Sequence, residues 1–307
     1  MKRRPILVTG SHRSGTSWVG GMIAASRSPR VGSIWEAFSL EHRPGTLDVR
    51  FPYWFPYVCS ENGAPLVAPI ADMLRFRYKP MAELGSLRGA KDAGRMVRDW
   101  GRLVRYRRAN AVPLLKDPIA LLSAEWLCDT FDMDVVVMIR HPAAFAYSLK
   151  RLGWAHPFDH FLRQPLLMRD LLQPFEPELR EFAARPRPTL DQAILLWNIL
   201  HSTVVGYRDR RPDWLYLRLE DVASDPVENF EHIYARLGLT YDETARAVVV
   251  AHSASNNPSE AEAPESIRRN SRASIVTWKS RLTKEEIHSV RSGVEHISHA
   301  FYSEADW

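Results

Sequence analysis

The expected fold follows from one stretch of sequence, Pro5-Ile6-Leu7-Val8-Thr9-Gly10-Ser11-His12-Arg13-Ser14-Gly15-Thr16-Ser17-Trp18. Its first five residues form a short apolar run that is typical of a buried parallel strand. A loop with Gly10 and Gly15 follows, and residues 18–26 then show a helical pattern. The backbone N–H groups of such a loop, together with the positive end of the next helix, form a pocket for a phosphate or sulfate group. The stretch therefore predicts an anion-binding loop between a strand and a helix.

The residues of this loop indicate which kind of group transfer it could support. Gly10 and Gly15 have the spacing of the nucleoside-triphosphate signature G-x-x-x-x-G-K-[ST], but Thr16 stands where that signature has lysine. Without the lysine, an enzyme that transfers phosphoryl groups lacks a main contact to the β- and γ-phosphates. Arg13 instead places a fixed charge inside the loop. Its guanidinium can bind two oxygens of a transferring group and neutralise charge on the bridging oxygen without a metal.

The rest of the chain alternates strand and helix patterns. We expect further strands at 112–115, 135–139 and 214–219, and helices at 121–130, 143–152, 190–207, 226–237 and 283–294. Such alternation predicts an α/β fold with a mostly parallel central sheet flanked by helices, of the P-loop NTPase-like kind. We interpret residues 1–307 as a single domain with acceptor-side insertions at about 37–110 and 153–190.

The composition excludes several classes of protein. With 307 residues, 45% hydrophobic and 25% charged, the chain is not intrinsically disordered, collagen-like or a disulfide miniprotein. Cys59 and Cys128 are widely spaced and support neither a disulfide framework nor a zinc site. No apolar run reaches the length of a membrane span, and we read no signal peptide or anchor. The expected location is therefore the cytoplasm.

Two motifs together resemble the sulfotransferases that use 3′-phosphoadenosine 5′-phosphosulfate (PAPS). The stretch from Pro5 to Trp18 looks like the 5′-phosphosulfate loop of that family. Residues 135–148 look like its 3′-phosphate motif, a strand that ends in Arg140 with Ser148 eight residues later. Elements around Lys116, in 219–239 and at Trp278-Lys279 are also similar to parts of bacterial and tyrosylprotein-type members. The resemblance implies PAPS as the sulfuryl donor, adenosine 3′,5′-bisphosphate (PAP) as the product, and no metal.

The resemblance also implies roles for individual residues. The expected donor-binding residues are Arg13, Ser14, Gly15, Thr16, Ser17, Arg140, Ser148 and, in an uncertain register, Lys279. The expected catalytic residues are Arg13, Glu36 and Lys116, with Glu36 as the general base. We expect the neighbouring aromatic side chains to shield the Glu36 carboxylate from water. His12, His42 and His141 are the rival bases, although the turn that contains His141 favours a structural role.

The sequence departs from the family in two places and leaves alternatives open. Ala37 follows Glu36 where relatives often have proline, and Leu219 precedes Glu220 where many relatives have tyrosine. A P-loop kinase acting on a small molecule is one alternative, disfavoured by the missing lysine and by the lack of an evident Mg²⁺-binding aspartate. A non-catalytic protein that binds nucleotides or anionic glycans is the other.

Two stretches that the family resemblance does not cover suggest the kind of acceptor. Residues 51–57 hold five aromatic side chains, which suit stacking on sugar rings or an aromatic alcohol but equally suit a buried cluster. Residues 88–105 form a basic helical pattern with apolar residues opposite, either a solvated face over a packed face or a contact for a polyanionic acceptor or a membrane surface. The net charge of +5 is modest, so we do not expect a nucleic-acid partner. We expect a glycan or glycolipid hydroxyl as the acceptor.

Overall fold

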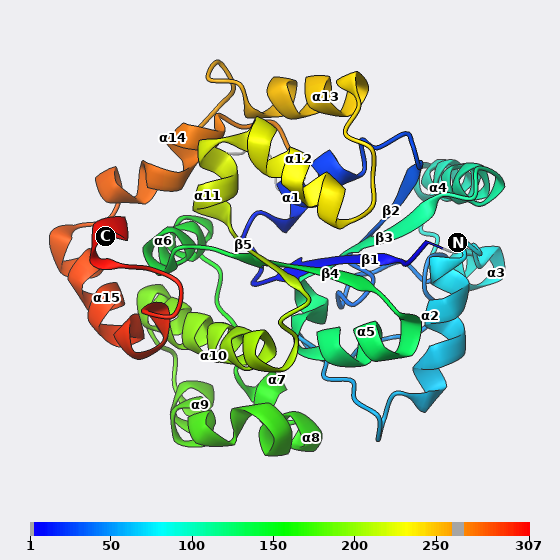
Figure 1. Cartoon of the computed structure of the whole chain (residues 1–307). Helices are drawn as coiled ribbons and strands as arrows, with labels where there is room; N and C mark the ends of the chain where they lie inside the picture. The colour runs from blue at the N-terminus through cyan, green and yellow to red at the C-terminus, as the bar shows by residue number, and fades with distance from the viewer. Residues whose placement is uncertain (1–2, 260–266) are drawn as a thin grey trace.

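The chain forms one parallel sheet that carries the predicted loop at its centre. The computed structural model describes residues 3–259 and 267–307. Within them lies a five-stranded sheet in the order β2-β3-β1-β4-β5 (Figure 1). Its strands are β1 (Ile6–Gly10), β2 (Val31–Trp35), β3 (Val112–Lys116), β4 (Asp134–Ile139) and β5 (Leu215–Arg218). The predicted α/β fold with a parallel sheet is confirmed.

Strand β1 determines where a ligand can bind. All five of its residues are buried. Ile6 pairs with Leu114 of β3 on one side and with Asp134 of β4 on the other. The order of the strands therefore reverses at β1, and in open α/β sheets the crevice beyond such a reversal is the usual binding site.

Strand β2 is absent from the sequence prediction. Gly32 and Ser33 interrupt its apolar run, and the strand lies at an edge of the sheet with Trp35 exposed. Gly32 is required there because a Cβ atom would lie 2.6 Å from the Phe76 ring. As a result, Glu36 follows an edge strand and lies beside the end of β3, since Trp35 pairs with Lys116.

Helices cover both faces of the sheet (Figure 1). Against one face, where Ile6 and Val8 point, pack α1 (Thr16–Ile23), α11 (Leu219–Ser224), α12 (Pro226–Arg236) and α13 (Glu243–Ser253). Against the other, where Leu7 and Val137 point, pack α5 (Ala124–Phe131), α6 (Pro142–Leu152) and α10 (Thr189–Arg210), with α15 (Lys284–Ser298) against α6 and α10. Burial of apolar side chains on both faces is what stabilises a parallel sheet.

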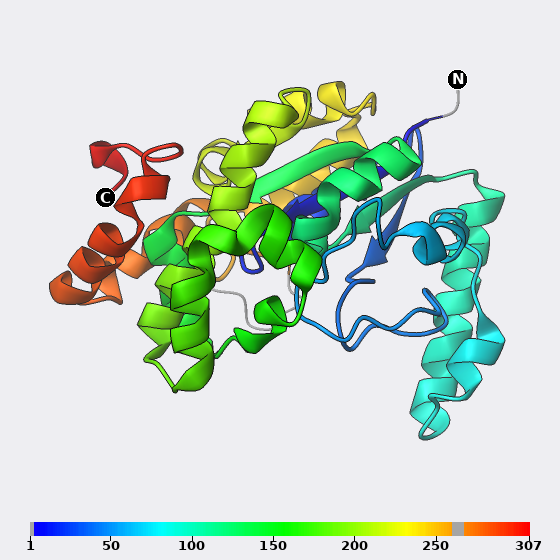
Figure 2. The same cartoon turned by 90° about the horizontal axis from the view of Figure 1, so that it is seen from below.

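The stretches expected as insertions carry the remaining helices. The first holds α2 (Val67–Leu74), α3 (Pro80–Leu84) and α4 (Ala90–Arg108), and the second holds α7 (Asp159–Leu162), α8 (Pro165–Leu167) and α9 (Glu176–Ala184). Helix α14 (Ser271–Val276) precedes α15, and short helical turns lie at Ala64–Leu66, Pro118–Ser123, Met168–Leu172, Gln173–Phe175, Thr277–Ser280 and Glu304–Asp306. Figure 2 shows α4 projecting from the body of the molecule. None of the described helices is both long and apolar enough to cross a membrane.

Helix α4 confirms the predicted helix but only part of its predicted packed side. Of the apolar residues opposite the basic side, Leu103 is buried, Met96 and Val104 are half-buried, and Val97 and Trp100 are exposed. Val97 is 60% exposed and Trp100 is 46% exposed. The inward face holds Asp99 instead, because its carboxylate pairs with arginines there. The interpretation of a solvated face over a packed apolar face is therefore confirmed only in part, and the alternative of a contact surface stays a prediction.

The predicted helix ends are confirmed where capping residues mark them. Thr283 and Glu286 form a reciprocal capping box at the start of α15. Asp225 caps α12 by accepting a hydrogen bond from the Glu228 N–H. Gly238 follows that helix with a φ of 62°, a left-handed conformation that favours glycine.

Candidate active site

A cavity of about 540 Å³ lies at the carboxyl ends of the central strands. One end of it is made by the glycine loop and by arginines, and the other by aromatic and aliphatic side chains from the two insertions. The donor-side lining comprises His12, Arg13, Gly15, Thr16, Ser17, Arg140 and Arg269. The cavity therefore contains both a place for an anion and an apolar compartment beside it.

The glycine loop has the geometry of an anion cradle. Gly10 and Gly15 have φ angles of 142° and 92°, and a Cβ atom on Gly15 would lie 2.6 Å from Leu219 Cδ1. Helix α1 begins at Thr16, so its free N–H groups lie beside the loop. The buried hydroxyls of Ser11 and Ser14 have no hydrogen-bond partner among the described residues. The free N–H groups at the start of α1 suit a phosphate or sulfate group.

The guanidinium groups of Arg13, Arg140 and Arg269 converge on this end of the cavity. Arg13 Nε donates to Ser148 Oγ at 3.0 Å, and Arg140 Nη1 donates to the Arg13 carbonyl at 2.6 Å. Burial, and then the charges of the neighbouring arginines, lower the pKa values of Arg140 and Arg269 to about 10. Partly buried cations that repel one another form a site that an anion would stabilise.

A narrower recess of about 50 Å³ continues from the arginines. Arg13, Arg140, Ser148 and Arg269 line it together with Thr277. The cavity and the recess thus bring together six donor-side residues of the sequence prediction: Arg13, Gly15, Thr16, Ser17, Arg140 and Ser148. Arginines and hydroxyl groups line this recess, which suits a second anionic group beside the glycine loop.

Arg269 is the site residue that sequence reasoning missed. It lines both the cavity and the recess, and its Nε atom is buried without a hydrogen-bond partner among the described residues. Its segment shows no strand or helix pattern in the sequence, so nothing local indicates that this side chain reaches the cavity. Lys279, the predicted contact from this part of the chain, is exposed, with its ammonium group 5.2 Å from the Trp278 ring centre. Of these two residues, Arg269 lines the cavity and the recess and Lys279 lines neither.

Glu36 and Lys116 form an ion pair at the neighbouring strand ends. Lys116 is fully buried, and its ammonium group lies 4.3 Å from the Trp35 ring centre. Glu36 has a left-handed φ of 49° and lines the cavity, with 47% of its side chain exposed. The expected shielding from water by aromatic neighbours is not found, since nearly half of the Glu36 side chain is exposed and its carboxylate pairs with Lys116. Lys116 holds Glu36 but does not itself line the cavity. Ser14, a predicted donor-binding residue, does not line the cavity either.

Asp117 fixes the loops around this ion pair. Its carboxylate accepts hydrogen bonds from the Phe38 N–H at 2.7 Å and from the Ile119 N–H at 3.0 Å. Burial, with a further contribution from Glu36, raises the pKa of Asp117 to about 7. The backbone on either side of the pair is therefore tied to one buried side chain.

The rival histidines are in environments that disfavour proton uptake or fix their rings. Burial and the charge of Arg13 lower the pKa of His12 to about 3, and its ring lies among Phe145 and Trp154. His42 contacts the carbonyls of Ser39 and Leu47. His141 stacks on the Trp278 ring at 4.7 Å, and its Nδ1 accepts the Ala143 N–H. Glu36 remains the best-placed candidate base.

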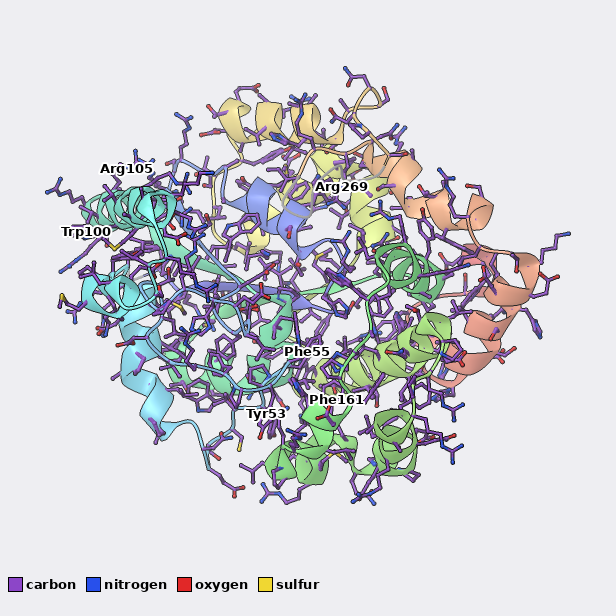
Figure 3. All side chains as sticks on the ribbon, turned by 180° about the vertical axis from the view of Figure 1, so that it is seen from behind. Tyr53, Phe55, Trp100, Arg105, Phe161 and Arg269 are labelled. Carbon is purple, nitrogen blue, oxygen red and sulfur yellow. The ribbon has the colours of Figure 1, made fainter. Side chains whose placement is uncertain are left out.

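The two insertions meet at the apolar end of the cavity. The Trp54 N–H donates to His160 Nδ1 at 3.0 Å, and the Tyr57 N–H donates to Gln164 Oε1 at 2.8 Å. Figure 3 shows Tyr53, Phe55 and Phe161 grouped here, apart from Arg269. The lining of this end comprises Trp54, Phe55, Pro118, Ile119, Leu149, Trp154, Ala155, Pro157 and Leu196, with Glu41 at its border. Such a surface suits an apolar body better than a polyanion.

Within residues 3–259 and 267–307, no group of three or more histidine, cysteine, aspartate and glutamate side chains could hold a metal ion. The positive charge in the described cavity comes from Arg13, Arg140 and Arg269.

Comparisons with solved structures identify the architecture. The sulfotransferase domain of the Synechococcus PCC 7002 olefin synthase is similar at a TM-score of 0.50 and 14% identity, over 98% of this chain and 96% of that one. The chain has the sulfotransferase fold. The sulfotransferase domain of the curacin biosynthetic pathway matches with the same score and identity, over 95% of this chain and 98% of the other. No protein-family model and no curated protein matches the sequence. The sulfotransferase fold of this chain is thus supported by its shape and not by close sequence relatives.

Proposed function

We propose that this protein is a sulfotransferase that moves the sulfuryl group of PAPS to a hydroxyl acceptor. The observation that carries the proposal is the convergence of Arg13, Arg140 and Arg269 beside a glycine loop that lacks the kinase lysine. The three cations suit a donor with phosphate groups at both its 5′ and 3′ positions. In the sulfotransferase fold found here, that donor is PAPS.

Each end of the donor has matching residues. The loop N–H groups of Gly15, Thr16 and Ser17 would hold the 5′-phosphosulfate at the start of α1. Arg140, Ser148 and Arg269, which line the narrow recess, would hold the 3′-phosphate. A triphosphate with Mg²⁺ fits this arrangement less well, because the loop has no lysine for the γ-phosphate.

The proposed reaction uses Glu36 as the base. The acceptor oxygen attacks sulfur, and the bond between sulfur and the bridging oxygen of the 5′-phosphate breaks. The acceptor proton passes to the Glu36 carboxylate, which Lys116 holds in place. Arg13 and the loop N–H groups stabilise the negative charge on the leaving PAP. Lys116 is therefore proposed as a positioning residue for Glu36.

The acceptor is proposed to be a hydroxyl on a neutral, largely apolar body such as a glycolipid. Trp54, Phe55 and Trp154 form much of the acceptor wall, whereas Glu36 and Glu41 are the charges that border it. Their negative charge would repel a polyanionic glycan. A cytoplasmic location stays a prediction.

Transfer of labelled sulfuryl from PAPS to a mixture of apolar alcohols and glycolipids tests the proposal. We expect turnover by the native protein and a loss of about 100-fold or more in kcat for Glu36→Gln, the range of general-base catalysis. Glu41→Gln, which removes a charge at the border of the same cavity, serves as the matched control and should retain turnover. Binding of PAP with no transfer to any acceptor would instead support a non-catalytic binding protein.

A further inference from the structure

Helices α3 and α4 form an exposed surface that the proposed active site does not use. Among the described residues, the large exposed hydrophobic side chains include Met81 and Leu84 of α3 and Val97 and Trp100 of α4. Their exposures are 79%, 47%, 60% and 46%. Figure 3 shows Trp100 and Arg105 at the outer side of the molecule, far in the view from Arg269. Grouped apolar exposure of this kind marks an interaction surface more often than scattered exposure does.

The acidic side chains of α4 do not contribute to its outer charge. Asp92 pairs with Arg95 one turn along the helix. Asp99 is buried and pairs with Arg43 at 2.8 Å and with Arg102 at 3.3 Å. The helix therefore neutralises its carboxylates on the inner side, which leaves the outer side to its cations.

The exposed cations of α4 are Lys91, Arg98, Arg105, Arg107 and Arg108. The ion pairs found among residues 3–259 and 267–307 include none of them. The same segment therefore offers both unneutralised positive charge and apolar side chains to the solvent.

The cations of α4 lie on both sides of a middle strip along its outer face. At 3.6 residues per turn, Val97 lies in the middle of the outer face together with Gly94 and Gly101. Nothing lies within 4 Å of a Cβ atom built on either glycine, so no other part of the protein covers the middle of this face. Lys91, Arg98 and Arg105 follow one side of this strip, and Trp100 and Arg107 follow the other.

We propose that α3 and α4 bind the surface of an anionic lipid membrane, with the outer face of α4 lying flat on it. The cations bind the lipid phosphates and carboxylates, while Val97, Trp100 and Met81 enter the boundary of the acyl chains. A polyanionic glycan or an acidic protein would account for the cations but not for apolar side chains placed between them. This membrane contact is independent of the proposed reaction.

Vesicle co-sedimentation of the full chain tests the membrane contact. We expect binding to phosphatidylcholine vesicles that contain about 30 mol% phosphatidylserine, and little binding to phosphatidylcholine alone. The double variant Arg98→Glu, Arg105→Glu should weaken binding at least about tenfold, since each basic residue near an anionic surface contributes about 1 kcal/mol. Trp100→Ser should weaken binding with no change in net charge.

A matched variant separates this surface from net charge. Arg246→Glu with Arg281→Glu makes the same change of charge at exposed positions on α13 and before α15, and it should leave vesicle binding nearly unchanged. Thermal unfolding and PAP binding identify any variant that is misfolded. Equal losses in the two double variants would overturn the proposed surface. Binding to heparin without binding to the anionic vesicles would overturn the membrane as the partner.

Discussion

The residues of the donor site share an unusual electrostatic situation, since partly buried arginines face one another across a cavity. Arg13 and Arg140 are held by hydrogen bonds, and Glu36 and Glu220 offset part of their charge. Burial and the charges of the two other arginines lower the pKa of Arg269. Such an arrangement costs free energy in the absence of an anion. The cost is the reason to expect tight binding of a bisphosphate nucleotide.

Arg269 provides the most specific test at this scale. We expect Arg269→Ala to weaken PAP binding by about 10- to 100-fold, because a hydrogen bond to a charged group contributes about 1.5–3 kcal/mol. The neighbouring Arg268 is exposed, so Arg268→Ala should change the Kd by less than about twofold. Calorimetric titration of both variants measures the difference. Equal affinities would remove Arg269 from the site.

Elements, rather than single residues, explain why some parts of the site could be predicted from sequence. The strand before the glycine loop and the strand before Arg140 are short, uninterrupted apolar runs, so both loops could be placed on one sheet. Strand β2 is too interrupted to be recognised, although it sets Glu36 beside Lys116, 80 residues away in sequence. Local patterns carry information about strands, but not about which strand ends meet.

The packing of surface elements was less predictable still. The spacing of basic residues correctly indicated α4 as a helix. It could not show that Asp99 would point inward, because the partner Arg43 lies 56 residues earlier. Arg269 was missed for a similar reason, since no periodic pattern links its segment to the cavity.

Two glycine substitutions, one in the loop before α1 and one in α4, should have opposite effects on stability. Gly15→Ala should destabilise the fold by about 1–3 kcal/mol and weaken PAP binding, because Gly15 has φ 92° and a Cβ atom would meet Leu219. Gly94→Ala in α4 meets no atom within 4 Å and should stabilise by about 0.5–1 kcal/mol. Chemical denaturation of both variants measures the contrast, and a Gly15→Ala protein as stable as the native one would contradict the proposed geometry.

At the scale of the whole molecule, the dominant pH effect comes from buried neutral histidines. Burial lowers the pKa values of His12, His141 and His201 from 6.5 to about 3. Below pH 6.5 the unfolded chain takes up protons that the folded chain refuses, so stability falls as the pH falls. Asp117, whose pKa is raised from 3.8 to about 7, acts in the opposite sense and favours the folded state at lower pH. Burial also lowers the pKa of His156 and raises that of Glu220. The four buried histidines outnumber the two buried carboxyls, and we expect a net loss of stability on acidification.

His201 isolates this effect because it lies away from the cavity, with its ring 4.0 Å from that of Trp197. His201→Phe retains an aromatic ring for that stack and cannot take up a proton. The native protein should lose more free energy of unfolding between pH 7 and pH 5 than the variant does, by up to about 1.4 kcal/mol per pH unit. Urea denaturation at the two pH values measures it. Parallel losses in the two proteins would show that His201 does not stay neutral in the fold.

The whole architecture places an arginine-lined recess, a glycine loop and a carboxylate around one cavity, and its central claim is the identity of the donor nucleotide. Calorimetric titration of the native protein with PAP, in buffer containing EDTA, tests that claim most directly. We predict one PAP bound per chain without metal, and much weaker binding of ATP under the same conditions and with Mg²⁺. Binding of ATP with Mg²⁺ and none of PAP would contradict the account and favour a kinase.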